Sequence, residues 1–463
     1  MPNSRQRFRV RFPKPFRLPQ ILGLLIVIQC VTLWQLLFAW SSPVTLSFVT
    51  PFDEVEYWVP LIKNFEKQHP GIHIELLDDS EIPYTTDDVE VIYTADLQQD
   101  IPRYDLIYMD IIWVPWFADK GWLKDLSEFI SAEELSAFLP SEVKAGRYQN
   151  RLYRIPFRSD VGVLFYNKRL LEKGGYRLST ELPKSLKDLK DISKDLQTQK
   201  IAKWGYIWQG QQYEGLVANF VEVLDSYGGF WIDLDKDNNN PEKVGLDQEA
   251  AIKAVDFLRD IIVSGESASD GEILDGETPP GISPADVRFL IEQQSLEMFE
   301  LGETAFLRGW SYFWKRANRA GGPLKGDFEV IPAAIYGGRG CRGGWGFGMA
   351  KNTKYPKEAW QAIEYFTSAS VQRQFVLNAG YLPSYQALFE DAEILKYYPH
   401  FSQLRQTLEN NSIFRPQFPD YGQASQILQA YLWQVLTGEQ TAETAMRQAA
   451  VETRRLFTSI NED

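Results

Sequence analysis

Several tryptophans in this chain lie close to acidic or guanidinium side chains instead of inside long apolar runs. Asp110 precedes Trp113, Arg308 precedes Trp310, and Trp345 follows two glycines. A pyranose presents C–H faces that pack on aromatic rings, and hydroxyl groups that pair with carboxylates, amides or arginines, so a sugar site needs both kinds of residue. The combination predicts a carbohydrate site, although each tryptophan taken alone is more often a core residue.

Three acidic residues follow or flank predicted strands: Glu54, Asp110 and Asp160. In α/β folds ligands bind at the edge of the sheet where the strands end, so these carboxylates are candidates for one site. Such a group can pair with sugar hydroxyls in a binding protein, or supply the acid and the base or nucleophile of a glycosidase. The sequence does not give the separation of the carboxylates, so a binding protein and a secreted glycosidase acting on a small glucoside both remain open.

The other chemistry-bearing residues exclude several classes of site. The three histidines, His69, His73 and His400, are too scattered for a zinc site, and the sequence has no P-loop and no nucleophile elbow. Cys30 and Cys341 are the only cysteines, and Cys30 lies in an apolar N-terminal stretch, so the rest of the chain has no internal disulfide. We therefore expect no metal and no cofactor.

The N-terminus predicts export. The first 42 residues contain six basic residues and no acid, so the rest of the chain has a net charge of −20, against −14 for the whole chain. Residues 18–40 form an uncharged apolar stretch after this basic head, which is typical of a signal peptide or a membrane anchor. Its length favours a retained anchor over cleavage near residues 39–41 or lipidation at Cys30. The body is expected on the periplasmic or extracytoplasmic face of the membrane, and its acidity argues against nucleic acid as a partner.

The elements that must position the candidate residues alternate between strands and helices. Apolar patterns predict a strand over 44–49, a helix over 54–68 and a strand over 73–77, which together form a unit of a parallel sheet. A hairpin is predicted over 146–157, followed by a separate strand over 161–166; helices then dominate, and strands return late in the chain. With 463 residues the chain can form more than one core, and this order indicates two α/β lobes between which the chain crosses more than once.

The chain contains, in this order, the segments DEVEYW, NFEKQHPGI, YDLIYMDIIWVPWFADKGWLKDL, RLYRIPFRSDVGVLFYNKRLLEKGGY, WGYIWQGQQYEGLVANFVEVLDSYGG, AFLRGWSYFW, GGWGFGMAKNT and FRPQFPDYGQAS. Together they resemble the extracellular solute-binding proteins of ABC sugar importers, most closely the trehalose/maltose-binding branch, over nearly all of residues 44–457. The resemblance implies a two-lobed periplasmic-binding-protein fold of the α/β class, with a hinge of crossover strands and lobes that close over a sugar. It places residues 43–160 and about 311–370 in the first lobe, and 161–310 and about 371–463 in the second, after a signal peptide or anchor over 1–42.

The resemblance also implies a set of sugar-binding residues. Carried over by motif, they are the acids Glu54, Asp110 and Asp160, the tryptophans Trp310 and Trp345, Gly344 and the late Arg415, and the same motifs add Trp113 and Tyr312. Two departures concern the sugar. Residues 78–100 contain no arginine, where the branch usually has a ligand arginine, and Arg158 stands where an aromatic residue is common. We hypothesise that Arg158 partly substitutes for the missing arginine and that one sugar subsite is altered.

The expected function is that of an ABC transporter subunit that captures a disaccharide or related glucoside, of the trehalose, maltose, sucrose or glucosylglycerol type, and is not an enzyme. Its expected partners are the sugar, the ABC permease subunits and, through them, the ATPase. These must be separate chains, because this one has a single apolar stretch and no P-loop. The protein is expected to be a monomer.

Overall fold

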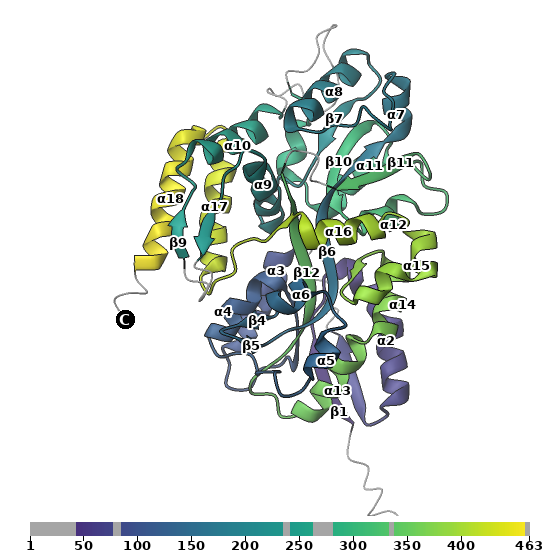
Figure 1. Ribbon diagram of the computed structural model, residues 1–463. Helices are drawn as coiled ribbons and strands as arrows, with labels where there is room; N and C mark the ends of the chain where they lie inside the picture. The colour runs from purple at the N-terminus through teal and green to yellow at the C-terminus, as the bar shows by residue number, and fades with distance from the viewer. Residues whose placement is uncertain (1–42, 77–84, 235–240, 263–280, 333–337, 459–463) are drawn as a thin grey trace, which may run out of the picture.

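The computed structural model describes residues 43–76, 85–234, 241–262, 281–332 and 338–458. They form two α/β lobes, one above the other, joined by long strands (Figure 1). Among these residues no helix is long and apolar enough to cross a membrane. The apolar stretch 18–40, predicted as a signal peptide or anchor, lies outside them.

The first lobe begins with the strand–helix–strand unit that the sequence predicts. β1 (Val44–Phe48) leads through η1 into α2 (Val55–Gln68) and pairs in parallel with β2 (Ile72–Leu76). Around this unit lie η1 (Phe52–Glu54), α3 (Thr86–Leu97), β3 (Leu106–Asp110), η2 (Ile111–Trp113), α4 (Val114–Asp119), α5 (Ala132–Leu135), α6 (Pro140–Ala145), β4 (Arg147–Tyr148), β5 (Arg151–Leu152), α13 (Pro356–Phe366), α14 (Ala369–Ala379), β13 (Leu382–Pro383), η6 (Gln386–Glu390) and α15 (Ala392–Tyr397).

An aromatic cluster forms the core of this lobe and lies under the candidate site. The indole of Trp58, on the buried face of α2, has its ring centroid 5.2 Å from that of Phe48, 5.3 Å from Tyr108, 4.8 Å from Phe157 and 5.5 Å from Phe347. Most of these contacts are edge to face, an arrangement that adds to the gain from burying the rings. The cluster ties α2 to four strands of the lobe.

The second lobe contains one end of the eight-stranded sheet that runs through both lobes, and helices cover it. β10 (Thr304–Trp310) pairs in parallel with β7 (Trp204–Ile207), and β11 (Phe328–Pro332) lies in the same sheet. The other elements here are α7 (Lys168–Lys173), α8 (Leu186–Thr198), α9 (Glu214–Ser226), β8 (Ile232–Leu234), β9 (Pro241–Val244), α10 (Glu249–Asp260), η4 (Ala285–Phe289), α11 (Glu292–Glu300), α12 (Phe313–Ala317), α16 (Phe401–Asn410), β14 (Ser412–Ile413), α17 (Tyr421–Leu436) and α18 (Ala442–Thr458).

Two long strands run from one lobe into the other. β6 (Ile155–Asn167) pairs through its first half with β12 (Gly340–Met349) and through its second half with β10 and β11. The predicted break between a hairpin over 146–157 and a strand over 161–166 is therefore wrong, because the hairpin ends with β5 and one continuous strand follows. The polar residues 158–160 favoured the break, but the structure buries all three within the ladder.

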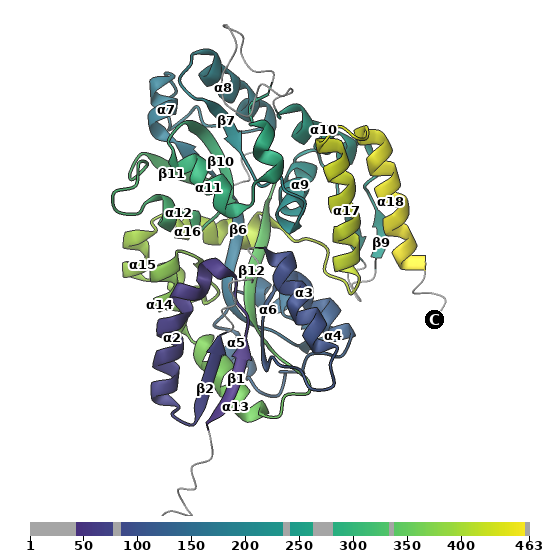
Figure 2. The ribbon, with the colours of Figure 1, turned by 180° about the vertical axis from the view of Figure 1, so that it is seen from behind.

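The lobe boundaries remain a proposal, and the packing favours a revision of one of them. α14, which contains the expected boundary at residue 371, packs against α2 and α13 of the first lobe. By contrast, α17 and α18 pack against α10 at the side of the second lobe (Figure 2). We therefore propose that the first lobe continues to at least residue 379.

Candidate functional site

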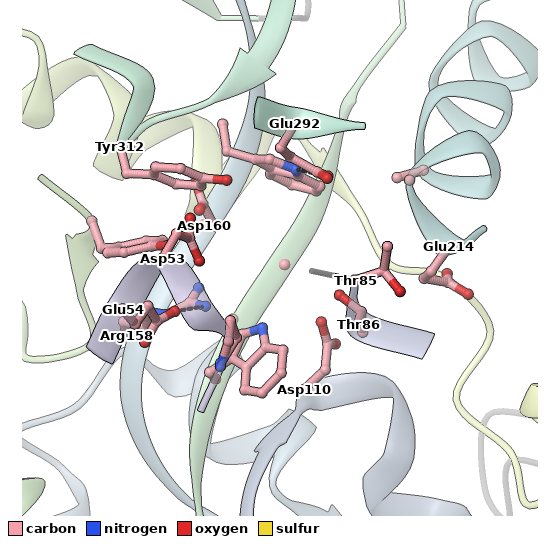
Figure 3. Close-up of a pocket in the computed structure, with 18 of the residues that line it drawn as sticks. Asp53, Glu54, Thr85, Thr86, Asp110, Arg158, Asp160, Glu214, Glu292 and Tyr312 are labelled. Atoms are coloured by element: carbon pink, nitrogen blue, oxygen red, sulfur yellow. Dashed lines mark hydrogen bonds and ion pairs between the residues drawn. The ribbon is translucent and has the colours of Figure 1, made fainter. Parts of the chain in front are cut away.

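A cavity lies between the two lobes, beside the crossover strands (Figure 3). It has about 860 Å³ of empty space, including its opening to solvent, which is within the range of small-molecule sites. All the residues predicted for the site line it, with the exception of Trp113. The sequence-based set lacks the other lining residues, which are Pro51, Asp53, Thr85, Thr86, Glu214, Gly215, Ala218, Ile291, Glu292, Gln293, Gly343 and Tyr381.

Asp110 and Asp160 each use one carboxylate oxygen to contact the protein. Asp110 ends β3, and its Oδ1 accepts a hydrogen bond from the backbone N–H of Ile112 at 3.2 Å. Asp160 lies in β6, and its Oδ1 accepts hydrogen bonds from the N–H and the hydroxyl of Ser311 at 3.1 and 2.9 Å. Within the described part of the chain neither Oδ2 atom has a hydrogen-bond partner, so both can accept from a ligand hydroxyl at the cavity wall.

Burial shifts the titration of Asp160. Its side chain is almost fully buried, and burial raises the pKa of the carboxyl group to about 6, against the opposing effect of the nearby Arg158 charge. The carboxylate is therefore mainly ionised at neutral pH, the form that accepts hydrogen bonds most strongly.

Two tryptophans line the cavity, and a buried arginine lies against each ring. Trp310 ends β10, and the guanidinium carbon of Arg308 is 4.2 Å from its ring centroid. Residues two apart on a strand share a face, which brings this arginine onto the indole. Trp345 lies in β12, and the guanidinium carbon of Arg158 is 5.3 Å from its ring centroid. Both distances allow cation–π attraction, which holds the rings in place.

A buried glutamate neutralises each of these arginines. Nη2 of Arg308 donates to Oε1 of Glu222 at 2.7 Å, and Nη2 of Arg158 donates to Oε1 of Glu54 at 2.5 Å. The two arginine–glutamate pairs, Arg308–Glu222 and Arg158–Glu54, therefore support one tryptophan each without adding net charge.

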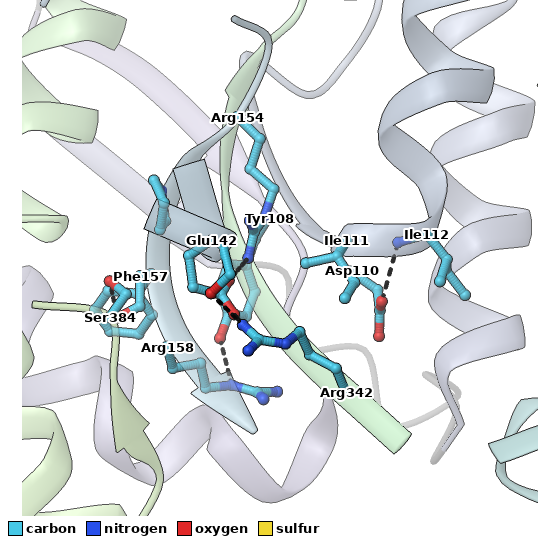
Figure 4. A network of polar contacts seen from close by, with 12 residues as sticks. Tyr108, Asp110, Ile111, Ile112, Glu142, Arg154, Phe157, Arg158, Arg342 and Ser384 are labelled. Carbon is cyan, nitrogen blue, oxygen red and sulfur yellow. Dashed lines mark hydrogen bonds and ion pairs between the residues drawn. The ribbon is translucent and has the colours of Figure 1, made fainter. Parts of the chain in front are cut away.

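Glu54 is fully buried, and both of its carboxylate oxygens are engaged. Oε1 accepts from Arg158, and Oε2 accepts from the hydroxyl of Tyr108 at 2.9 Å and from Nε1 of Trp58 at 3.3 Å. Nε of Arg158 in turn donates to the Tyr108 hydroxyl at 3.0 Å (Figure 4), and its guanidinium carbon is 4.0 Å from the ring centroid of Tyr381. Glu54 thus orients Arg158. Of the Arg158 nitrogens, Nη1 has no hydrogen-bond partner among the described residues and remains available for a ligand.

Arg415 joins acids that come from different lobes. Its Nη1 donates to Oε1 of Glu214 at 2.7 Å, and its Nη2 donates to Oδ1 of Asp110 at 3.3 Å. Glu214 begins α9 and also accepts from the hydroxyls of Tyr421 and Ser425. This network fixes the end of the cavity opposite Asp160.

Two further acids of the cavity were missed by the sequence-based prediction. Glu292, the first residue of α11, accepts from Nε1 of Trp310 at 3.1 Å and from the hydroxyl of Tyr213 at 2.7 Å, so it fixes the plane of that indole. Oδ2 of Asp53 lies 3.6 Å from Nη1 of Arg316, which belongs to the opposite lobe. Asp53 directly precedes Glu54, which was the one sequence signal for it, whereas no motif marks Glu292.

Trp113 and Gly344 contribute in different ways. The Trp113 side chain is buried, and its ring packs edge to face on Trp345 with a centroid distance of 5.2 Å, so it supports that ring from outside the cavity. Gly344 has φ of +153°, and a Cβ atom there would lie 3.0 Å from Oε2 of Glu142. The positive φ and the nearby Glu142 side chain thus favour glycine at this position of β12.

Acidic side chains outnumber basic ones in the cavity lining. Its lining acids are Asp53, Glu54, Asp110, Asp160, Glu214 and Glu292, against the arginines Arg158 and Arg415. Across the described ranges there is no group of three or more histidine, cysteine, aspartate or glutamate side chains that could hold a metal ion.

Two lobes around a cavity of carboxylates and indoles define a receptor that encloses a small polar ligand. The chain belongs to the family of bacterial extracellular solute-binding proteins, whose model matches residues 52–373. It is the solute-binding component of an ABC sugar transporter, and such components pass their ligand to the permease subunits. The family consists of binding proteins and not of enzymes, so the expectation of a non-catalytic receptor is confirmed over the glycosidase alternative.

The similar proteins include binding proteins for maltose and its oligomers. A probable ABC transporter-binding protein of Deinococcus radiodurans is 27% identical over 79% of this chain and 83% of its own. The maltotriose-binding protein of Pyrococcus abyssi is 21% identical over 61% of this chain and 55% of its own. Among solved structures, maltose-bound MalE3 of T. maritima superposes with a TM-score of 0.78 at 28% identity, covering 89% of this chain and 99% of that one. These matches confirm the two-lobed α/β fold.

Proposed function

We propose that the protein captures a glucoside of about disaccharide size, of the trehalose, maltose, sucrose or glucosylglycerol type, and presents it for import. One observation carries this proposal: the cavity has acids at two ends with two tryptophans between the lobes. Asp160 and Tyr312 lie at one end and Asp110 and Thr86 at the other (Figure 3). Two ends with acceptors suit a ligand with hydroxyl groups at both of its ends, and indoles suit the C–H faces of its rings.

The comparisons support an α-linked glucose ligand. The T. maritima relative is described with bound maltose, and the P. abyssi relative is named for maltotriose. Because this chain has Arg158 beside the cavity and no arginine in 78–100, we propose that one of its sugar subsites is altered.

Isothermal titration against trehalose, maltose, sucrose and glucosylglycerol tests the ligand, followed by a check of each solution for hydrolysis. We expect one of the four to bind with a stoichiometry of one and to remain intact. If none of them binds, a small glucoside is the wrong ligand class. Release of free glucose would overturn the proposal in favour of hydrolysis.

The role of Arg158 is a separate prediction. Because removal of Arg158 alone would leave the buried Glu54 without a counter-charge, the variant should be the double one, Arg158→Ala with Glu54→Gln, with Glu54→Gln alone as its control. We expect the double variant to bind the best sugar at least about tenfold more weakly than the control, from loss of a charged hydrogen bond through Nη1. Equal affinities in titration would show that Arg158 makes no ligand contact.

We also propose that residues 18–40 stay on the mature protein as an anchor, which would raise its concentration near the permease. The mass of the protein purified from membranes decides this, since cleavage near residues 39–41 would remove the whole segment.

A further inference from the structure

Asp87 makes hydrogen bonds across the cleft. It lies in the first turn of α3, in the first lobe, and both of its acceptor atoms are used by residues of the second lobe. Oδ1 accepts the backbone N–H of Glu214 at 3.0 Å, and Oδ2 accepts Nε2 of Gln429 on α17 at 3.1 Å. Asp87 itself does not line the cavity, although its neighbour Thr86 does.

The Glu214 N–H belongs to a helix end that has no cap in its own lobe. α9 begins at Glu214, and its N-cap residue, Tyr213, makes no side-chain capping bond; the Tyr213 hydroxyl donates to Glu292. The first N–H groups of a helix need acceptors, and a carboxylate there also interacts favourably with the helix dipole. Asp87 therefore acts as the cap of α9 from the opposite lobe.

Asp87 is free for this contact because α3 is capped by other residues. Thr85 and Asp88 form a reciprocal capping box at the start of α3, in which each side chain accepts from the backbone of the other. The local stability of α3 thus does not depend on Asp87. Its two contacts, in contrast, exist only while the lobes are together.

The partners of Asp87 connect it to the cavity. Gln429 also donates to the hydroxyl of Ser425, which donates to Glu214. Glu214 lines the cavity, and its carboxylate accepts from Arg415 while its backbone N–H donates to Asp87, so the cross-cleft contact and the cavity network share one residue. A movement of α3 away from α9 would break the cap and loosen this end of the cavity together.

We propose that Asp87 is a positioning residue for ligand capture, a helix cap supplied across the cleft that stabilises the closed arrangement of the lobes and maintains a closed population even before sugar binds. The inference depends on the two-lobed fold and not on which sugar is bound. It predicts a residue that changes closure without touching the ligand.

The experiment measures the distance between spin labels at Lys63→Cys in the first lobe and Lys184→Cys in the second, both exposed, in a Cys30→Ser background with Cys341 buried. For Asp87→Ala we expect the ratio of short to long distances without sugar to fall by about tenfold, because the variant removes both cross-cleft hydrogen bonds of Asp87. In Asp87→Asn, which keeps an acceptor for the Glu214 N–H, this ratio should fall less than in Asp87→Ala. Adding Gln429→Ala to Asp87→Ala should lower the ratio little further, because Asp87→Ala already removes the bond between Asp87 and Gln429.

Asp88→Ala is the matched control, since it removes an acid from the same turn that acts only within α3. An equal shift in Asp88→Ala would reduce Asp87 to a local structural role and overturn the inference. An unchanged distribution in Asp87→Ala, or a wild type with no short distances before sugar is added, would overturn it as well. Failure of all four sugars to bind would count against the proposed ligand alone, because the spin-label comparison is made without sugar.

Discussion

Arg308 is fully buried between the carboxylate of Glu222 and the ring of Trp310. Removing two charges from water costs about as much free energy as their attraction returns, so such a pair adds little net stability. The role of the pair is to position Trp310, because the fixed guanidinium of Arg308 holds the indole at the cavity. The loss of one partner is costly, since the other charge then remains buried without a counter-ion.

We expect Arg308→Met to lower the free energy of unfolding by about 3–5 kcal/mol, because Glu222 keeps its buried charge without a partner. The double variant Arg308→Met with Glu222→Gln should recover part of this loss. Urea unfolding measures both. A single variant within about 1 kcal/mol of the wild type would contradict the explanation.

His400 gives the stability of the protein a pH dependence. Its ring packs 4.4 Å from that of Trp314, and burial lowers the pKa of His400 to about 3, from an ordinary value of 6.5. The folded state favours the neutral ring, so this contribution is complete above pH 6.5 and decreases as the pH falls toward 3, by at most about 1.4 kcal/mol per pH unit. Thermal unfolding should therefore show a smaller loss of stability between pH 7.5 and 5 for His400→Phe than for the wild type, and equal losses would refute the assignment.

At the scale of elements, β12 brings its residues to the cavity through an irregular backbone. Its register against β6 shifts between Trp345 and Gly346, just after the positive φ of Gly344. Beneath it, Glu142 accepts hydrogen bonds from Arg154 and Arg342, both at 3.3 Å (Figure 4). Irregular strand geometry of this kind re-aims a side chain, here the indole of Trp345.

We expect Gly344→Ala to weaken sugar binding and to lower the free energy of unfolding by about 1–3 kcal/mol, because the new Cβ meets Glu142 and the backbone must leave its present conformation. Gly438→Ala is a suitable control, since Gly438 also has a positive φ, +80°, but has open space around the Cβ position. The Gly438→Ala variant should have a lower free energy of unfolding and an unchanged affinity for the sugar. If both variants bind sugar as the wild type does, the irregular backbone of β12 at Gly344 has no role in placing Trp345.

At the scale of the whole molecule, charge limits which sugars can enter. Six acids and two arginines line the cavity, and the chain after residue 42 is strongly acidic. A carboxylate or phosphate on the ligand would lose its hydration and meet charges of the same sign.

Anionic sugars should therefore not bind. We expect glucose 1-phosphate and glucuronides to give no heat in titration and no displacement of the preferred sugar, at low as well as at moderate salt. Competition by either compound at the concentration of the neutral ligand would show that the acids are neutralised in the closed site.

The sequence predicted the cavity residues that lie within recognisable motifs, but not those that only the folding of the chain brings to the cavity. Asp110 and Trp345 end or occupy strands whose patterns are clear, and both line the cavity as expected. Glu292 and Tyr381 come from segments without any pattern, and only the packing of α11 and β13 beside the crossover strands places them there. Trp113 was predicted as a site residue because it lies close to Asp110 in the sequence, but its side chain is buried in the core.

The fold was predictable to the same extent and for the same reason. Local periodicity marks α2 and its flanking strands, which need no distant partner to be recognised. The continuity of β6 depends on the polar residues 158–160 being paired with β12, which lies almost two hundred residues later in the chain. The local sequence pattern does not reveal a pairing strand so far along the chain. A run of polar residues is therefore predicted as the end of a strand, even where the structure buries it.

The cavity draws on both ends of the chain, with Asp53 near the start of the described residues and Arg415 close to their end. Bonds such as Asp87 to Gln429 join equally distant segments. The site is therefore incomplete until almost all of the chain between these residues has been synthesised and folded. A chain that ends before Arg415 lacks the residue that joins Asp110 to Glu214, so it cannot form that end of the cavity.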